Sequence, residues 1–150
     1  MHVVCVCDVV WGNCGKGLSD KLQKFQNRAV RIILDLSYRS HVTTVHLSTL
    51  GWKDLASRRQ MHLLQTVYKS IHNQLPEYLV DIFNRTSEIH TYSTRHSLNQ
   101  SLRLPKAKLE CGQRMFAYRG VVSWNRLPLI ARTAQSMQSF KTQCRQLCDL

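Results

Sequence analysis

The chain has 150 residues and 21 Lys and Arg against 9 Asp and Glu, which gives a net charge of 21 − 9 = +12. The length suits one domain, and a hydrophobic content of 43% excludes disorder of the whole chain. Only 6 Gly and 3 Pro exclude collagen-like and Pro/Gly-rich low-complexity proteins. The positive excess makes a polyanion the expected partner, a nucleic acid before an anionic membrane surface.

The N-terminal segment does not have the features of a secretory signal peptide. No Lys or Arg precedes the apolar run of residues 2–11, and Asp8 interrupts that run. No stretch approaches the ~20 apolar residues of a transmembrane helix. We therefore expect an intracellular chain, in cytoplasm or nucleus, that is not secreted, has no membrane partner and keeps its thiols reduced.

The cysteines do not have the spacing of a structural zinc site. They are Cys5, Cys7, Cys14, Cys111, Cys144 and Cys148. Zinc knuckles use paired C-x-x-C motifs, which are missing here. Cys144 and Cys148 instead continue an apolar helical stripe with Met137, Phe140 and Leu147. Because free cysteine is by preference a small buried hydrophobe, we expect these two in the core rather than in a metal or redox site.

The first third of the chain predicts one long amphipathic helix. Residues 3–11 are rich in valine and indicate a strand or a buried apolar segment, and residues 12–17 form a Gly-rich turn. Ser19 is expected to cap a helix that ends near Leu36. The apolar positions expected to face the core are Leu22, Phe25, Ala29, Ile32, Ile33 and Leu36. The basic positions are Lys21, Lys24, Arg28 and Arg31, on a flank roughly a quarter turn away.

Three further helices are predicted in the middle of the chain. A short one over residues 42–50 ends at Gly51. Asp54 is expected to cap a longer one that runs to about Asn73. The expected buried positions of this longer helix are Leu64, Val67, Tyr68, Ile71 and Leu75. Pro76 then suits the first turn of a short helix over residues 77–83.

The pattern weakens over residues 84–113, where only the alternation of residues 101–104 predicts a short strand. Apolar residues over 115–124 indicate a helix that ends near residues 125–128, and a last helix spans about Ser136 to Leu147. We therefore expect a mainly α fold. It would be one small domain over residues 1–150, with about five helices and an irregular middle segment. Its parts would be a basic helical half at 1–83, an irregular connector at 84–113 and basic C-terminal helices at 114–150.

The positive charge is concentrated in the last third of the chain. Residues 1–50 carry 6 − 3 = +3, residues 51–100 carry 6 − 4 = +2 and residues 101–150 carry 9 − 2 = +7. Cations next to aromatic rings are typical of nucleic-acid binding. Here the rings are Phe116, Tyr118 and Trp124, and the candidate cations are Arg114, Arg119 and Arg126. The alternative, which we prefer for the rings, is that they are core residues.

No catalytic motif is complete. The run Gly12-x-x-Gly15-Lys16-Gly17 has Val10 where a phosphate-binding loop needs its first glycine, and Gly17 where it needs a hydroxyl. The carboxylates are scattered, and no set of side chains has the spacing of a nucleophile, base and orienting group. We expect no catalytic residues, no metal ligands, no cofactor and no small-molecule substrate.

Several short runs, taken in order, are similar to a known family. The runs are Asp8-Val9-Val10-Trp11-Gly12-Asn13-Cys14, Leu22-Gln23-Lys24-Phe25-Gln26-Asn27-Arg28-Ala29-Val30-Arg31-Ile32-Ile33, Leu50-Gly51-Trp52 with Arg58-Arg59, Leu75-Pro76-Glu77-Tyr78-Leu79, Trp124-Asn125-x-Leu127-Pro128 and Ser139-Phe140-Lys141. Together they resemble the region after the polymerase palm, near the thumb, in reverse transcriptases of non-LTR (LINE-type, jockey-like) retrotransposons. The Gln-Asn-Arg-Ala and Trp-Asn-x-Leu-Pro runs contribute most to the resemblance, which extends from about residue 8 to 148.

The resemblance implies that the chain corresponds to a part of an RNA-directed DNA polymerase that lacks the catalytic residues. The family's palm uses adjacent aspartates to hold two Mg²⁺, and this sequence has no Asp-Asp pair. The helical part that remains is expected to contact the backbone of template or primer, as a remnant of a truncated element. The expected function is therefore non-catalytic binding of RNA or DNA backbone. The alternative is an inert or protein-interaction fragment whose apolar faces pack on the missing polymerase portion.

Overall fold

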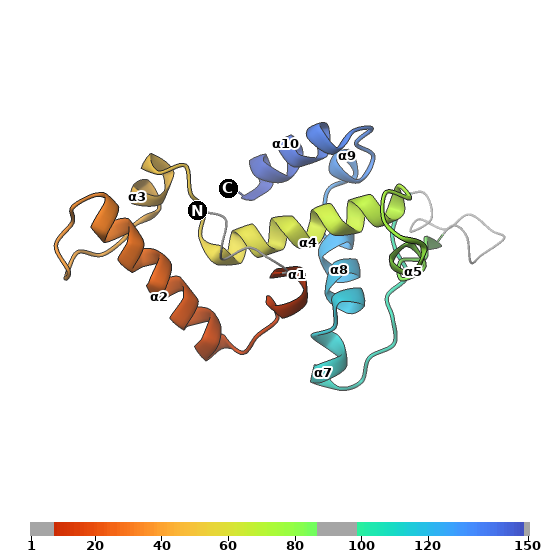
Figure 1. Cartoon of the computed structure of the whole chain (residues 1–150). Coiled ribbons are helices and arrows are strands. Elements are labelled where there is room, and N and C mark those ends of the chain that lie inside the picture. Colours follow the sequence, from red (N-terminus) through yellow and green to blue (C-terminus); the bar gives the residue numbers. More distant parts are fainter. Residues whose placement is uncertain (1–7, 87–98, 149–150) are drawn as a thin grey trace. The chain divides into compact units, whose positions relative to one another are not determined.

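The computed structural model describes residues 8–86 and 99–148, and this part of the chain is mainly helical, as the sequence predicts (Figure 1). The helices are α1 (Asp8–Trp11), α2 (Lys16–Ile33), α3 (Thr44–Thr49), α4 (Leu55–Ile71), α5 (Glu77–Val80), α7 (Glu110–Gln113), α8 (Phe116–Asn125), α9 (Leu129–Arg132) and α10 (Met137–Cys148). The chain forms two compact units, Met1–Gln60 (unit 1) and Met61–Leu150 (unit 2). Their boundary falls within α4.

The start of the described chain corrects the strand alternative. Residues 8–11 form the short helix α1, and the Gly12 amide donates to the Asp8 carbonyl at 2.7 Å. Residues 3–7 of the predicted segment lie outside the described residues. A run of β-branched residues favours a strand only where strand neighbours are present to pair with it. Here the local helical hydrogen bond satisfies the backbone instead.

The helix α2 has the predicted position but a different N-cap. Gly15 is the N-cap, and its carbonyl accepts from the amides of Leu18 and Ser19 at 3.0 and 3.1 Å. The expectation that Ser19 caps the helix is therefore wrong, because the Ser19 hydroxyl lies one turn inside and accepts from Arg59 Nη1 at 2.9 Å.

Two helices in unit 1 end in the same backbone motif. After α2, Asp35 adopts a left-handed φ of 49°, and the Leu36 amide donates to the Arg31 carbonyl at 2.8 Å. After α3, Gly51 has φ of 64°, and the Trp52 amide donates to the Leu47 carbonyl at 2.8 Å. Both are Schellman motifs, which pair carbonyls that the helix end leaves open. The predicted stop at Gly51 is thus confirmed.

The predicted cap of α4 is also confirmed. Asp54 Oδ2 accepts from the Ser57 amide at 3.1 Å, which satisfies one of the donors that every helix N-terminus exposes. At its other end α4 stops before Asn73, which has φ of 54°. The expected buried face of this helix is present in Leu64, Val67 and Tyr68, while Ile71 and Leu75 are half-buried.

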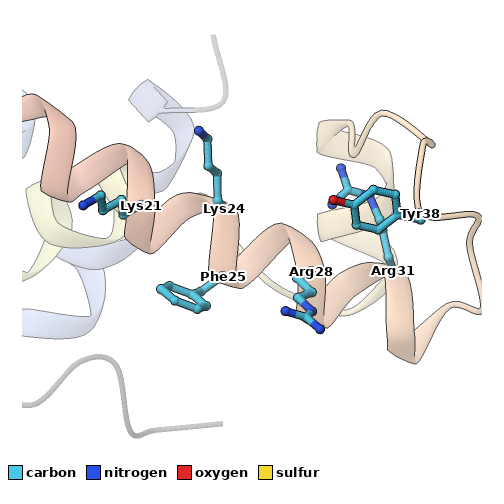
Figure 2. A pocket seen from close by; sticks show the side chains of 6 residues that line it. All are labelled: Lys21, Lys24, Phe25, Arg28, Arg31 and Tyr38. Carbon is cyan, nitrogen blue, oxygen red and sulfur yellow. The ribbon is translucent and has the colours of Figure 1, made fainter.

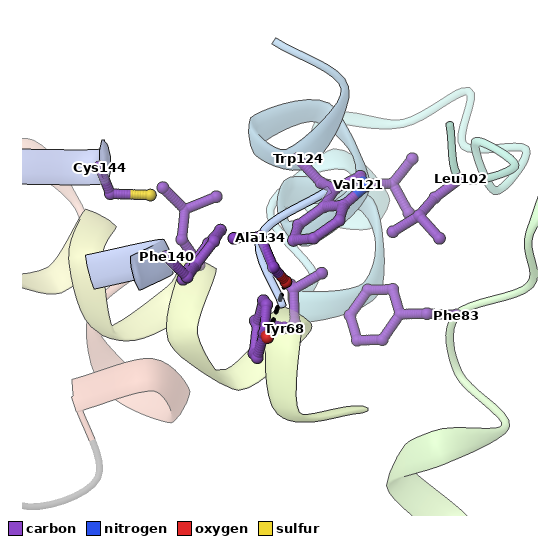
Figure 3. Close-up of a cluster of buried hydrophobic side chains, with 10 residues drawn as sticks. Tyr68, Phe83, Leu102, Val121, Trp124, Ala134, Phe140 and Cys144 are labelled. Carbon is purple, nitrogen blue, oxygen red and sulfur yellow. Dashed lines mark hydrogen bonds between the residues drawn. The ribbon is translucent and has the colours of Figure 1, made fainter. Parts of the chain in front are cut away.

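Aromatic side chains form the core of unit 2 (Figure 3). The Phe140 ring stacks on Tyr68 with centroids 4.6 Å apart, and on Trp124 at 5.8 Å. The Tyr68 hydroxyl donates to the Ala134 carbonyl at 3.0 Å, so the buried polar tip of the ring has a partner. Cys144 is 1% exposed within this core, which confirms its predicted burial, while the side chain of Cys148 lies outside the described part of the structure.

The Trp124-Asn125 pair binds the backbone of residues 100–102. Trp124 Nε1 donates to the Gln100 carbonyl at 3.1 Å. The Asn125 side chain accepts from the Leu102 amide and donates to the Leu102 carbonyl, both at 2.9 Å. Of the strand predicted over residues 101–104, the described residues contain one antiparallel bridge, between Arg85 and Leu102. The Asn125 side-chain amide therefore pairs with the N–H and C=O groups of Leu102, which a further strand would pair with in a sheet.

The preference for core rings over binding rings in the last third is confirmed for Trp124 and Phe116, whereas Tyr118 is half-buried and lines a hollow. Trp124 is 1% exposed, and Phe116 is half-buried with its ring edge against Phe83 at a centroid distance of 5.3 Å. Among the described residues, no helix is long and apolar enough to span a membrane.

A test of this core uses Gly120, where α8 comes close to Phe83 and to Val67 of α4. A Cβ at Gly120 would lie 2.9 Å from side-chain atoms of both residues. We expect Gly120→Ala to lower the free energy of unfolding by about 1–3 kcal/mol, because the added methyl overpacks the core. Urea denaturation followed by circular dichroism measures the change. Gly17→Ala is the control, since a Cβ there meets nothing within 4 Å; an equal loss in both variants would contradict the packing described.

Candidate functional site

The four basic residues predicted on α2 line one hollow. It has a volume of about 560 Å³ and lies in unit 1 (Figure 2). Its lining residues are Lys21, Lys24, Phe25, Arg28, Arg31 and Tyr38. The predicted spacing of 3, 4 and 3 residues thus brings all four cations to the same cavity, together with two aromatic rings.

The helix geometry explains this gathering. At 100° per residue, the five lining residues on α2 fall within an arc of roughly 120°. From Lys21 to Arg31 they follow the axis for roughly 15 Å. Figure 2 shows the Phe25 ring on the same side of α2 as Arg28, with Tyr38 next to Arg31. The surface is therefore an elongated row of charge with one ring within it and a second ring at the Arg31 end.

Most of the charge of this row has no ion-pair partner among residues 8–86 and 99–148. Helix α2 contains five basic residues and one acidic residue, a net 5 − 1 = +4. In the part of the chain that the structure describes, Lys21, Lys24 and Arg28 have no carboxylate partner. Clustered cations of this kind raise the local potential and attract anions. The hollow is therefore an anion-attracting surface.

Arg31 differs from the other three because it also holds the loop after α2. Its Nε donates to the Ser40 carbonyl at 2.9 Å. Together with the Schellman motif at Asp35, this bond fixes both ends of the short loop that carries Tyr38. The Tyr38 ring is consequently presented at the hollow by an anchored backbone.

Amide side chains attach the opposite face of α2 to the start of α4. Gln26 is 4% exposed, and its Nε2 donates to the Lys53 carbonyl at 2.9 Å. Gln23 Oε1 accepts from the Leu55 amide at 3.1 Å, while Gln23 Nε2 donates to Gln26 Oε1 at 2.9 Å. The Leu55 amide is a donor that the first turn of α4 leaves open. The buried face of α2 is thus centred on these amides and on Val30, which is fully buried.

This attachment corrects the predicted apolar face of α2. Phe25 is 68% exposed, Ile32 is 72% exposed and Ile33 is 53% exposed, although all three were expected to face the core. The hydrogen bonds of Gln23 and Gln26 rotate the helix so that Phe25 and Ile32 lie on the outward side, next to the cations.

The three candidate arginines of the last third occupy separate positions along α8. Arg114 precedes the helix and forms an ion pair with Glu110. Arg119 lies within the helix and is half-buried. Arg126 is the C-cap residue and is exposed, roughly 10 Å along the axis from Arg119.

Two hollows of unit 2 lie against the extended segment before α7. One, of about 370 Å³, is lined mainly by apolar atoms of residues 105–118, and the other, of about 480 Å³, contains Arg103 and Lys106. Lys106 lines both of these cavities. Their linings place fewer cations together than the α2 hollow does.

Sequence reasoning missed the two rings of the α2 hollow. Phe25 was assigned to the core, and Tyr38 was not singled out. No local signal identifies them, because the partners of Gln23 and Gln26, whose hydrogen bonds turn Phe25 outward, lie 27 and 32 residues away in the sequence.

The described residues contain no group of three or more His, Cys, Asp or Glu side chains that could hold a metal ion. Comparison of the chain with protein-family models, with curated proteins and with solved structures finds no match.

The attachment of α2 can be tested through Gln26. We expect Gln26→Ala to accelerate amide hydrogen exchange in residues 16–33 by about tenfold, because losing the bonds to Lys53 and Gln23 removes about 1–2 kcal/mol of local stability. Arg28→Ala, on the outward face, is the control and should leave the exchange rates within about twofold. Equal exchange in the two variants would show that the amides do not hold the helix.

Proposed function

We propose that the chain is a non-catalytic module that binds the backbone of RNA or DNA through the hollow along α2. The observation that carries the proposal is the convergence of Lys21, Lys24, Arg28 and Arg31 on one cavity, three of them without a carboxylate partner among the described residues. The resemblance to the region after the palm of retrotransposon reverse transcriptases suits the same function.

Electrostatics predicts how binding at this surface should depend on salt and on sequence. Each phosphate that a Lys or Arg neutralises releases condensed counterions, so affinity falls steeply as salt rises. Phosphates are identical along every strand, and contacts to them position a protein without reading sequence. The module should therefore bind many sequences with similar affinity and lose that affinity at high salt.

Arg114, Arg119 and Arg126 form a second candidate contact region in this proposal. Their contribution should be smaller, since Arg114 already pairs with Glu110 and Arg119 is half-buried. Arg126, exposed at the end of α8, is the one best placed to meet a phosphate.

A second candidate function is packing against another protein, such as the missing polymerase portion. The observation that favours it is the exposure of Ile32 and Ile33 beside the hollow, at 72% and 53%. Exposed apolar clusters mark interaction surfaces. Association through these side chains would persist at high salt, which separates it from phosphate binding.

The proposed function is tested with the triple variant Lys21→Gln, Lys24→Gln and Arg28→Gln. Arg31 is left in place because it holds the loop at Ser40. We expect the slope of log affinity against log salt to become shallower by about 0.7–0.9 for each phosphate that the variant no longer neutralises. Fluorescence anisotropy with labelled RNA and DNA, over a salt series, measures the slope.

The matched control removes the same charge from exposed positions of unit 2, with Lys69→Gln, Arg103→Gln and Arg145→Gln. If net charge alone governs binding, the two triple variants will lose affinity equally, and the assignment to α2 fails. A wild-type chain that binds neither RNA nor DNA at low salt, with its helical content intact, would contradict the function as a whole.

A further inference from the structure

The α2 hollow contains two rings that phosphate binding does not require. Phe25 is 68% exposed and Tyr38 is 86% exposed, although both line a cavity whose other four residues are cations. Leaving a large apolar ring in water forgoes the stabilisation that burial would give it. Unlike Trp124 and Phe116 of α8, which pack in the core of unit 2, these two rings remain available to a ligand.

The position of each ring follows from hydrogen bonds within unit 1. Phe25 lies on the outward side of α2 because Gln23 and Gln26 fix the opposite side. Tyr38 is held at the other end by the loop that Arg31 anchors through the Ser40 carbonyl. Figure 2 shows the cations between and beside the two rings. The two rings therefore share one surface with the cations, Phe25 on α2 and Tyr38 on the loop that follows it.

Base stacking is the chemistry that such a surface supplies. Every nucleobase has a flat face, and stacking on an exposed aromatic ring stabilises a bound strand without regard to sequence. In a duplex these faces are covered by neighbouring base pairs, so a ring on a protein surface reaches them only in an unpaired strand. A cavity of about 560 Å³ lies within the range of sites that hold molecules the size of a nucleotide.

We propose that the α2 hollow selects single-stranded over double-stranded nucleic acid, with phosphates on Lys21, Lys24 and Arg28 and unpaired bases stacked on Phe25 and Tyr38. This inference rests on the proposed function and names the form of nucleic acid that the same site takes. Phosphate contacts supply attraction to any strand, and the rings add affinity only where bases are unpaired.

The test compares three labelled ligands of about 16 nucleotides, a length at the upper end of common single-strand sites. They are a uniform uridine strand, the same strand in a duplex, and an abasic strand with the same backbone charge. We expect the full-length protein to bind the uridine strand most tightly. A deoxyuridine strand forms a further arm, and the ratio of its affinity to that of the uridine strand shows whether the 2′-hydroxyl adds to binding.

The decisive variants are Phe25→Ala and Tyr38→Ala. Each should lower affinity for the uridine strand by roughly tenfold and leave the abasic strand and the duplex unchanged, because only stacking is removed. Tyr78→Ala, which removes another exposed tyrosine, on α5 (72% exposed), should leave the affinity for all three ligands unchanged. Since all three side chains are exposed, folding of the variants should be preserved, and circular dichroism checks it.

The outcomes separate this inference from the function on which it rests. If the ring variants bind all three ligands as the wild type does, while the triple Lys/Arg variant loses affinity, stacking is overturned and backbone binding stands. If the wild type binds duplex and single strand equally, selection for single strands is overturned as well. If it binds no ligand at low salt, both proposals fail.

Discussion

Everything proposed for the α2 hollow depends on the hydrogen bonds behind the helix. Gln26 donates to the Lys53 carbonyl, and Gln23 accepts from the Leu55 amide that α4 leaves open at its first turn. Gln26, which is buried, and Gln23, which is half-buried, lie on the side of α2 where apolar side chains lie in most surface helices. The cost of burying them is offset because each has a partner. These hydrogen bonds set the rotation of α2 about its axis, so that the basic row and the Phe25 ring both face outward.

The basic row of α2 could be predicted from sequence because spacing alone places residues on one side of a helix. The rotation of that helix in the fold could not. Hydrophobicity assigns Phe25, Ile32 and Ile33 to the interior, whereas the partners of Gln23 and Gln26 lie about thirty residues away and leave no periodic trace. The Asp54 cap and the stop at Gly51 are local, and both predictions hold. Ser19 does not cap α2 because the helix begins about one turn earlier, at Lys16, and the Ser19 hydroxyl accepts from Arg59 instead.

Unit 2 illustrates the same distinction. The helices α8 and α10 follow from their apolar patterns, and the burial of Trp124 and Cys144 follows from residue type. The alternation of residues 101–104 predicts a strand, and the segment forms one antiparallel bridge, with Arg85. The Asn125 side-chain amide, which no alternation pattern predicts, pairs with both backbone groups of Leu102. Trp124 and Phe116 thus pack in the core of unit 2. Cations and exposed aromatic rings lie together at α2 instead.

The measurement that tests the account most directly is a titration of ¹⁵N-labelled full-length protein with a single-stranded oligonucleotide, followed residue by residue by NMR. The account predicts that the largest shifts at low salt fall within residues 21–38, on α2 and the loop that carries Tyr38, and that they shrink as salt rises. Larger shifts around α8, or shifts spread evenly over both units, would contradict the assignment of binding to the α2 hollow.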